Sequence, residues 1–370
     1  MNRLSRLPRA PVTEFLVFAM SLCALVSGCS TSSGSSATSE AGDIAGSNDT
    51  QTAGPNEDSQ VTAPDEDTGQ PITTEHNPGE ITCHDHTTGK AGSRDIVEWT
   101  STDGTTFTQR RLFQYCADVP SLAQNPDGTI LAAFQGWVDK EEDARWDKIA
   151  LRRSEDNGES WSEVSFATFE GLPSQGRPFD PTITWDPEQS LWRMYFSLGM
   201  NGNMLDHTVC THSASSTNGI DYVYEEGERY CADDWPVIDP AVLRHEGTWY
   251  YIAPVGAPQD GAHFATSSDG LSFTAGPSIP SDMKHNWTGN LASDGSTLRF
   301  YAAEGQVPQG NFLWWASTDD QGATWSDYTR TNVPGPPAGK DPGVVHLNDG
   351  TWLLLVPGDS SAEGSPESPR

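Results

Sequence analysis

Short apolar runs alternate with polar turns along most of the chain. One unit, VIDPAVLRHEGTWYYIAPVG at 237–256, has an Asp after an apolar residue, a short apolar run, a polar turn, an aromatic-rich run and a closing Gly. The same order returns at residues 116–136, 178–199, 286–305 and 339–358. Self-similarity at a regular spacing is typical of repeat architectures. The repetition therefore indicates a fold built from similar units, whatever the role of any single motif.

A second motif runs between these units: Ser or Thr, an Asp or Asn, Gly, then an aromatic residue. It reads STDGTTF at 101, SEDNGESW at 154, STNGIDY at 216, SSDGLSF at 267 and TDDQGATW at 318. Tight-turn residues between apolar runs predict hairpins. The two motifs together predict four short strands per unit, and capped helical periodicity is nearly absent. The expected fold is all-β, a propeller built from such blades.

The motifs are out of step at the two ends of this region. The first turn motif, at 101–107, precedes any inner-strand motif, and the last inner-strand motif, at 341–358, has no outer strands after it. One composite blade is therefore predicted, with inner strands from the C-terminal part and outer strands from about residues 94–112. This closure would remove open sheet edges. The predicted fold is a five-bladed β-propeller.

The two ends of the chain do not resemble folded domains. Residues 1–28 have three arginines, the apolar run FLVFAMSLCALV and then VSG, which together indicate an export signal. VSGC resembles the lipobox of bacterial lipoproteins, which implies that Cys29 is lipidated. Residues 29–79, poor in apolar residues, are expected to form a disordered acidic tether before a propeller at 80–358, and 359–370 a disordered tail.

The chain is strongly acidic, with 21 Lys and Arg against 52 Asp and Glu and a net charge of −31. Removing residues 1–28 takes away three basic residues and one acidic residue, which leaves 18 against 51. This balance argues against nucleic acid or anionic lipid as a partner. We expect a monomer that touches a membrane only through its lipid anchor, exported to the bacterial outer membrane or cell surface.

Cysteine use agrees with export. Without the signal peptide and Cys29, an even number of cysteines remains, which in an oxidising compartment suggests two disulfides. Of three connectivities, Cys210–Cys231 and Cys83–Cys116 are favoured. No Cys or Cys/His spacing suggests zinc. No cofactor is expected, and a central cation such as calcium is the alternative.

Strand direction predicts which residues meet at one face. Inner strands start, and second strands end, at the same face around the axis, whereas the turn motifs fall on the opposite face and are predicted to be structural. The inner-strand starts supply Asp118, Asp180, Asp239 and Asp341. The fourth blade offers Trp287 or Thr288 there instead, and it alone ends its second strand on a carboxylate, Glu304, where the first blade has Gln135.

Several carboxyl groups in one funnel raise each other's pKa or recruit a cation. Glycoside hydrolysis needs one carboxyl group protonated as acid and another ionised as base or nucleophile. Catalysis does not need four equivalent aspartates, so at least two of them are expected to be structural, bonding backbone amides near the axis.

Five blades with Asp-Pro at the inner-strand starts resemble the five-bladed propeller glycosidases, the arabinanase/xylosidase and fructosidase group of families 43 and 32. The resemblance implies Asp118 as base, Asp239 as the residue that tunes the pKa of the acid, and Glu304 as acid. One feature departs from the family: its acid Glu lies on the inner strand, whereas Glu304 ends the second strand.

The turn motifs resemble the Asp-box of sialidases, which makes a sialidase-like hydrolase an alternative. Sialidases have six blades and an Arg triad that grips the carboxylate of sialic acid. The first Arg of that triad would fall at Asp118, so an anionic sugar is disfavoured at this position.

The expected function is that of a lipid-anchored glycoside hydrolase acting on neutral glycans, with a non-catalytic glycan- or partner-binding propeller as the main alternative. Trp137 and Trp287 offer aromatic faces for sugar rings, and the remaining substrate contacts are expected from Asp180, Asp341, Gln135 and Arg177.

Overall fold

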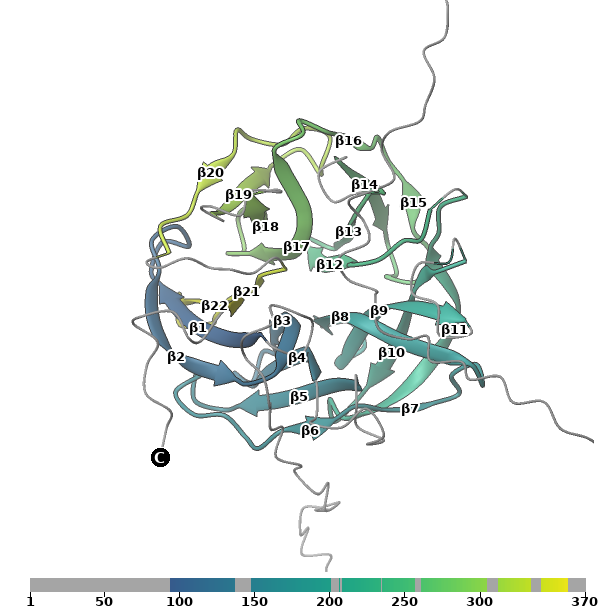
Figure 1. Ribbon diagram of the computed structural model, residues 1–370, viewed down its shortest axis with the longest axis horizontal. Helices are drawn as coiled ribbons and strands as arrows, with labels where there is room; N and C mark the ends of the chain where they lie inside the picture. The colour runs from purple at the N-terminus through teal and green to yellow at the C-terminus, as the bar shows by residue number, and fades with distance from the viewer. Residues whose placement is uncertain are drawn as a thin grey trace, which may run out of the picture. The chain divides into compact units, whose positions relative to one another are not determined.

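Five antiparallel sheets surround a central axis in the computed structural model, as Figure 1 shows. The structure describes residues 94–136, 148–200, 206, 208–233, 235–256, 261–304, 312–333 and 341–358. Within these residues the inner strands contact one another in a closed order, β21–β3–β8–β12–β17 and back to β21. The predicted five-bladed propeller is confirmed.

Each blade is ordered here from its innermost strand outward. Blade 1 has β3 (Ala117–Gln124), β4 (Ile130–Gly136), β5 (Lys148–Ser154) and β6 (Ser165–Phe166). Blade 2 has β8 (Gly176–Asp186), β9 (Leu191–Met200), β10 (Cys210–Ser216), β11 (Asp221–Tyr230) and β7 (Thr168–Glu170), which lies parallel to β11.

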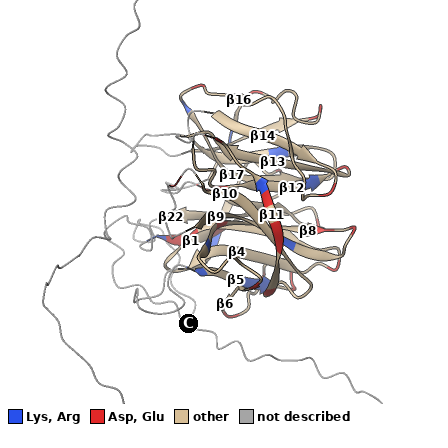
Figure 2. Cartoon of the chain, turned by 90° about the vertical axis from the view of Figure 1, so that its right-hand side faces the viewer, with Lys and Arg blue, Asp and Glu red and all other residues tan. Residues whose placement is uncertain are grey.

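Blade 3 has β12 (Ala241–His245), β13 (Thr248–Pro254) and β14 (Gly261–Ser267), with β15 (Thr274–Ala275) and β16 (Ile279–Pro280) both pairing with β14. Blade 4 has β17 (His285–Ser293), β18 (Leu298–Glu304), β19 (Leu313–Thr318) and β20 (Thr329–Arg330). In blade 2, β11 is acidic, and Figure 2 shows red along it, where Asp221, Glu226 and Glu228 are exposed.

The fifth blade joins the two ends of the folded region. Its inner strands are β21 (Gly343–His346) and β22 (Trp352–Gly358), and its outer strands are β1 (Asp95–Ser101) and β2 (Thr108–Gln114). β1 pairs with β22 along its whole length, from Asp95 opposite Gly358 to Ser101 opposite Trp352. The composite blade predicted from the out-of-step motifs is therefore present.

The turn motifs form hairpins, as predicted, and connect the third and fourth strands of every blade. In the composite blade, the Ser101 hydroxyl donates to Asp103 (2.9 Å) and accepts from the Gly104 amide (2.9 Å), while Asp103 accepts from the amides of Thr105 and Thr106 at 2.8 and 2.7 Å. The other four turns repeat this closure around Ser154, Ser216, Ser267 and Thr318. We call this end of the propeller the turn face.

The glycine of each turn packs against the preceding blade. At Gly270, which has a φ of +73°, an added Cβ would lie 2.7–2.8 Å from Tyr195, Arg193 and Trp249. At Gly104, with a φ of +68°, it would lie 2.7–2.8 Å from Arg299, Tyr301 and Trp352. At these two positions glycine is required both by the backbone conformation and by the close approach of the preceding blade.

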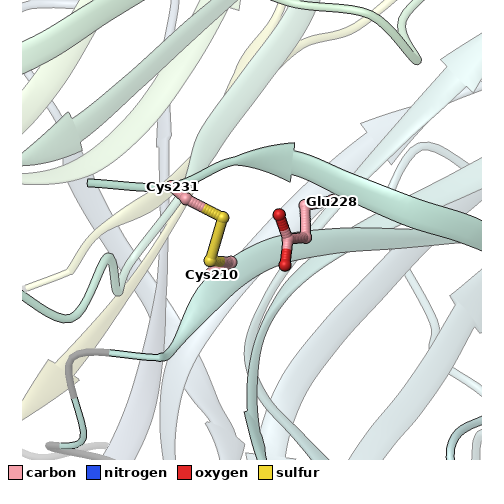
Figure 3. A group of neighbouring side chains, drawn as sticks. All are labelled: Cys210, Glu228 and Cys231. Carbon is pink, nitrogen blue, oxygen red and sulfur yellow. A yellow bond between two sulfur atoms is a disulfide. The ribbon is translucent and has the colours of Figure 1, made fainter. Parts of the chain in front are cut away.

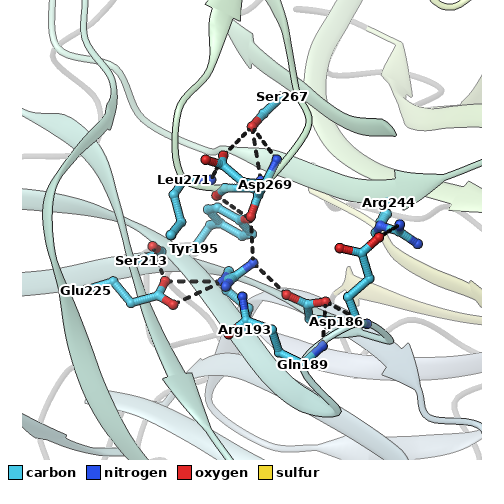
Figure 4. Close-up of polar contacts among 12 residues, drawn as sticks. Asp186, Gln189, Arg193, Tyr195, Ser213, Glu225, Arg244, Ser267, Asp269 and Leu271 are labelled. Carbon is cyan, nitrogen blue, oxygen red and sulfur yellow. Dashed lines mark hydrogen bonds and ion pairs between the residues drawn. The ribbon is translucent and has the colours of Figure 1, made fainter. Parts of the chain in front are cut away.

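Blades 2 and 4 hold these turns with the same Arg-x-Tyr sequence on their second strand. In Figure 4, Arg193 donates to Asp186 (2.9 Å) and to the carbonyl of Asp269 (3.3 Å), while Tyr195 donates to the carbonyl of Gly270 (2.7 Å). In blade 4, Arg299 and Tyr301 donate likewise to the carbonyls of Asp103 and Gly104. A buried guanidinium needs such partners, because an unpaired buried charge is costly.

One predicted disulfide is confirmed. Cys210 and Cys231 are bonded, and this bond ties the start of β10 to the residue after β11. Cys116 is also disulfide-bonded, but Cys83, its predicted partner, lies outside the described residues. The predicted lipidation site Cys29, the signal peptide, the tether and the tail lie outside them too. Among the described residues, no helix is long and apolar enough to cross a membrane.

Candidate functional site

The inner strands begin with an unusual backbone conformation at the end of the propeller opposite the turn face, which we call the mouth. Four residues there have positive φ and precede a proline: Val119 (49°), Asp180 (50°), Asp239 (52°) and Asp341 (61°). Positive φ is uncommon outside glycine and is tolerated best by Asn and Asp. The pairing of β3, β8 and β17 shifts register close to this point.

Asp118 does not occupy the repeat position predicted for it. The structure places Val119, followed by Pro120, where blades 2, 3 and 5 have an Asp followed by Pro. The proline, rather than the nearest Asp, marks the equivalent position in the sequence. Because Val119 adopts the same backbone conformation, that conformation alone does not explain why three blades carry a carboxyl group there.

A small cavity lies on the axis and receives residues from all five blades. It is lined by Val119, Pro120, Asp180, Pro181, Thr182, Asp239, Pro240, Gly289, Asn290 and Asp341. Its volume is about 10 Å³, which is close to the space that one water molecule needs. A sugar ring is far larger, so a glycan can meet these carboxyl groups only from the open side of the mouth.

The axial aspartates influence one another's pKa. Asp180 and Asp239 line the same small cavity, and burial, followed by the charges of Asp341 and Asp118, raises the pKa of Asp180 to about 7. Burial and then the charge of Asp180 also raise the pKa of Asp239 well above its ordinary value. A raised pKa favours the protonated form of these two carboxyl groups.

Asp118 is a different kind of carboxyl group. Its side chain is buried, with 6% of the residue exposed, and it accepts a 2.7 Å ion-pair hydrogen bond from Arg94. Burial raises the pKa of Asp118, while the Arg94 charge opposes that shift and favours the ionised form. Arg94 lies outside the repeated motifs, so only its place immediately before the first strand of the propeller could have pointed to it.

Three further predicted residues lie at the mouth ends of their strands. Gln135 pairs with Asp118 across β3 and β4 and is buried. Arg177 lies near the start of β8, opposite Gly199, and is partly buried. Glu304 ends β18, where its backbone pairs with His285 at the start of β17, so it lies at the predicted end of blade 4. The side chain of Glu304 is outside the described part of the structure.

Trp287 does not offer a face to a sugar, contrary to the prediction. Its residue is 1% exposed, and its ring packs against Phe300 (centroids 5.0 Å apart), Trp314 (5.1 Å) and Trp325 (5.8 Å). The ring fills the core of blade 4, as a large apolar side chain does when its strand is enclosed. Trp137, the other predicted aromatic contact, lies outside the described residues.

Asn290 is an axial residue that the sequence analysis missed. Its amide donates to the Ser121 hydroxyl at 3.2 Å, which links blade 4 to blade 1 across the axis. Ser121 also accepts from the backbone amide of Ile183 in blade 2 (3.1 Å). The pattern offered one clue, because Thr288 and Gly289 stand where the other blades have the residue before proline and the proline.

The described residues hold one group of three metal-type ligands, and it is not a metal site. Ligand atoms of Cys210, Glu228 and Cys231 lie within 4.8 Å of one another. Figure 3 shows that the two sulfur atoms are bonded to each other, with the Glu228 carboxylate beside them. The predicted alternative of a central calcium ion stays a prediction.

No family model and no curated protein matches the chain. Solved structures do match, and those with the same fold include glycosidases. One, from the GH130 family of mannoside phosphorylases, is 13% identical with a TM-score of 0.49 and covers 69% of this chain and 85% of its own. An α-L-arabinofuranosidase from Clostridium thermocellum is 16% identical with a TM-score of 0.47, covering 64% and 80%.

A fructofuranosidase from Schwanniomyces occidentalis is 14% identical with a TM-score of 0.48 and covers 69% of this chain and 52% of its own. The Hadza microbial sialidase Hz136 is 15% identical with a TM-score of 0.44, covering 65% and 52%. The chain is thus similar to glycosidase propellers, as its motifs predicted. At these identities and scores, the similarity concerns the fold and assigns no activity or residue role.

Proposed function

We propose that the protein is an exported glycoside hydrolase that acts on neutral glycans at the mouth of its propeller. The observation that carries the proposal is the contrast between neighbouring carboxyl groups at the axis. Burial and like charge raise the pKa of Asp180 and Asp239, which favours a protonated form, whereas Asp118 is ion-paired with Arg94. Glycoside hydrolysis requires protonated and ionised carboxyl groups in one site.

Each proposed role follows from local electrostatics. Asp118 is the proposed base, because its ion pair with Arg94 opposes the rise in pKa that burial causes. Glu304 is the proposed acid, at the mouth end of β18. Asp239, with its partner Asp180, is the proposed pKa-tuning group, since negative charge close to an acid opposes its ionisation.

A neutral substrate suits this site better than an anionic one. Asp118, Asp180, Asp239 and Asp341 share one region, and the charges of Asp118 and Asp341 already act on the Asp180–Asp239 pair. An anionic sugar placed over them would meet like charge, which costs binding energy.

Export and lipid anchoring complete the proposal. The Cys210–Cys231 disulfide supports an oxidising compartment, because such bonds rarely persist in the cytosol. The anchor rests on the lipobox-like VSGC sequence and on Cys29. Mass spectrometry of the protein from bacterial membranes should detect a lipid on Cys29, and a Cys29→Ala variant should appear in the soluble exported fraction.

Hydrolysis is tested with the full mature chain on neutral aryl glycosides and polysaccharides. Glu304→Gln should lose about 10²-fold or more in kcat on natural glycosides and much less on substrates whose leaving group needs no proton. Asp118→Asn should lose activity on both, because the base is needed whatever leaves. Glu155→Gln, which alters a 72%-exposed carboxylate at the turn face, is the matched control and should leave turnover unchanged.

If neither axial variant changes turnover on any substrate that the protein hydrolyses, the catalytic assignment is wrong. If the protein hydrolyses none of the panel but binds neutral glycans, and Asp118→Asn weakens that binding, the propeller is a binding module.

A further inference from the structure

A second and larger cavity lies at the mouth end of blade 4. Its volume is about 370 Å³, within the roughly 300–1,000 Å³ range of small-molecule sites. It is lined by Lys284, His285, Phe312, Leu313, Trp314, Asp327, Tyr328 and Arg330, none of which lines the axial cavity. It forms where the connection into β17 meets the mouth ends of β19 and β20. We call it the blade-4 pocket.

Aromatic rings supply much of its wall. Phe312 and Tyr328 are each 37% exposed, which makes them two of the few large apolar side chains in the described structure that reach solvent. Tyr328 stacks on His285 with ring centroids 3.5 Å apart and meets Trp314 edge to face at 4.8 Å. A ring held this firmly can offer its remaining exposed surface to a ligand at little cost in side-chain entropy.

Arg330 supplies a cation to this pocket. Its guanidinium lies over the Phe312 ring, and it forms no ion pair with any residue that the structure describes. Lys284 is a second cation of the same pocket. Two cations among eight lining residues stand out in a chain with 21 basic and 52 acidic residues. A guanidinium matches the geometry of a carboxylate and can bind it through two parallel hydrogen bonds.

The acidic groups at the pocket have separate uses. Asp282 hydrogen-bonds to the His285 ring and to the backbone amides of Lys284 and His285, so it is occupied by its own loop. Asp327 lines the cavity itself, where its carboxylate can accept hydrogen bonds from hydroxyl groups. Aromatic surface, a hydroxyl acceptor and a guanidinium together suit a sugar that carries a carboxylate.

We propose that the blade-4 pocket is a second ligand site, which binds a uronic acid unit with its ring against Tyr328 and Phe312 and its carboxylate on Arg330. The site is separate from the axial carboxyl groups and does not depend on whether these catalyse hydrolysis. It would let the protein hold an acidic unit of a glycan at blade 4 while neutral units lie over the axis.

Calorimetric titration of the full mature chain with methyl β-D-glucuronide and methyl β-D-glucoside tests this pocket. The two ligands differ only at C6, which is a carboxylate in the glucuronide and a hydroxymethyl group in the glucoside. The glucuronide should bind at least about tenfold more tightly, because hydrogen bonds to charged groups are the stronger ones. Arg330→Gln should remove that advantage. Arg153→Gln, which removes a charge from a 44%-exposed side chain at the end of β5, is the matched control and should change nothing.

Two further measurements distinguish the blade-4 pocket from binding at the axis and from simple anion binding. Asp180→Asn alters the axial site and should leave glucuronide binding unchanged. The result of this test is therefore independent of whether the axial carboxyl groups hydrolyse glycans. Sodium acetate should bind at least about tenfold more weakly than the glucuronide if the sugar ring contributes. Equal affinity for glucuronide and glucoside, equal affinity for acetate and glucuronide, or full affinity in folded Arg330→Gln protein would each overturn the proposal.

Discussion

The two ends of the propeller use the same residue type, aspartate, in opposite ways. At the turn face, backbone amides and hydroxyl groups donate to Asp103, Asp156, Asp269 and Asp320, and these hydrogen bonds lower the pKa of each. At the mouth, burial and neighbouring carboxylates raise the pKa of Asp180 and Asp239. The direction of the pKa shift therefore depends on the hydrogen-bond donors and charges around the carboxyl group and not on the residue type.

The difference also concerns repetition. The turn face repeats one hydrogen-bond pattern in all five blades, and each turn glycine supports the packing between blades. The mouth departs from its own repeat in two blades: Val119 replaces an Asp in blade 1, and Thr288 does so in blade 4. Repetition therefore indicates a structural role here, and departures indicate where a specific role can be sought.

The largest expected effect on stability comes from removing strands that run between the mouth and the turn face. Deleting residues 339–370 removes β21 and β22, the whole inner half of the composite blade, and leaves β1 paired only with β2. Cooperative unfolding should be lost, because the ring of inner strands is opened and new sheet edges are exposed. Circular dichroism melting curves measure this, and a sharp transition like that of the full chain would contradict the closure described here.

A smaller effect is expected from a methyl group at the turn face. Gly270→Ala should lower the free energy of unfolding by about 3 kcal/mol or more, because strain at positive φ adds to overlap with Tyr195, Arg193 and Trp249. Gly128→Ala is the matched control: its φ is +91°, and an added Cβ would meet nothing within 4 Å. It should cost about 1–2 kcal/mol. Equal losses in urea unfolding would mean that the turn does not lock adjacent blades.

The smallest effect depends on pH and distinguishes the mouth from the turn face. The folded-state pKa of Asp180, about 7, lies above its ordinary value of 3.8, so protonation of this group stabilises the fold below about pH 4, and that contribution is lost as pH rises through 7. For Asp156, with a pKa of about 2, the contribution is present above about pH 4 and lost as pH falls toward 2.

The free energy of unfolding should therefore fall less between pH 5 and pH 8.5 in Asp180→Asn than in the unaltered protein. The two falls should differ by about 1 kcal/mol or more, which corresponds to a difference of roughly one in pKa. Urea unfolding at both pH values measures it. Asp156→Asn, the control at the turn face, should leave that difference as it is in the unaltered protein. An Asp180→Asn variant with the same pH dependence as the unaltered protein would show that this carboxyl group is already ionised at pH 5.

Much of the fold was predictable because it depends on local, repeated sequence. Turn motifs require Ser or Thr, Asp or Asn, and Gly at set spacings, and their phase relative to the inner-strand motif already implied a composite blade. The Cys210–Cys231 bond was predictable for a similar reason, since both cysteines lie in one repeat. Asp118 was placed one position away from its structural equivalent, because in this blade Val119, and not the nearby Asp, stands directly before the proline that marks the repeat position.

Residue patterns alone were enough for the all-β class, the number of blades and the end of the propeller where the inner-strand aspartates gather, because strand direction and turn chemistry are short-range properties. They could not tell which groups at that end act on one another. The packing within blade 4 turned Trp287 inward against Phe300 and Trp314, while the closed ring paired Asp118 with Arg94 and brought Asp180 and Asp239 to one cavity. Those partners lie on different blades or far apart in sequence, so their distances and their shared burial exist only once the ring is closed.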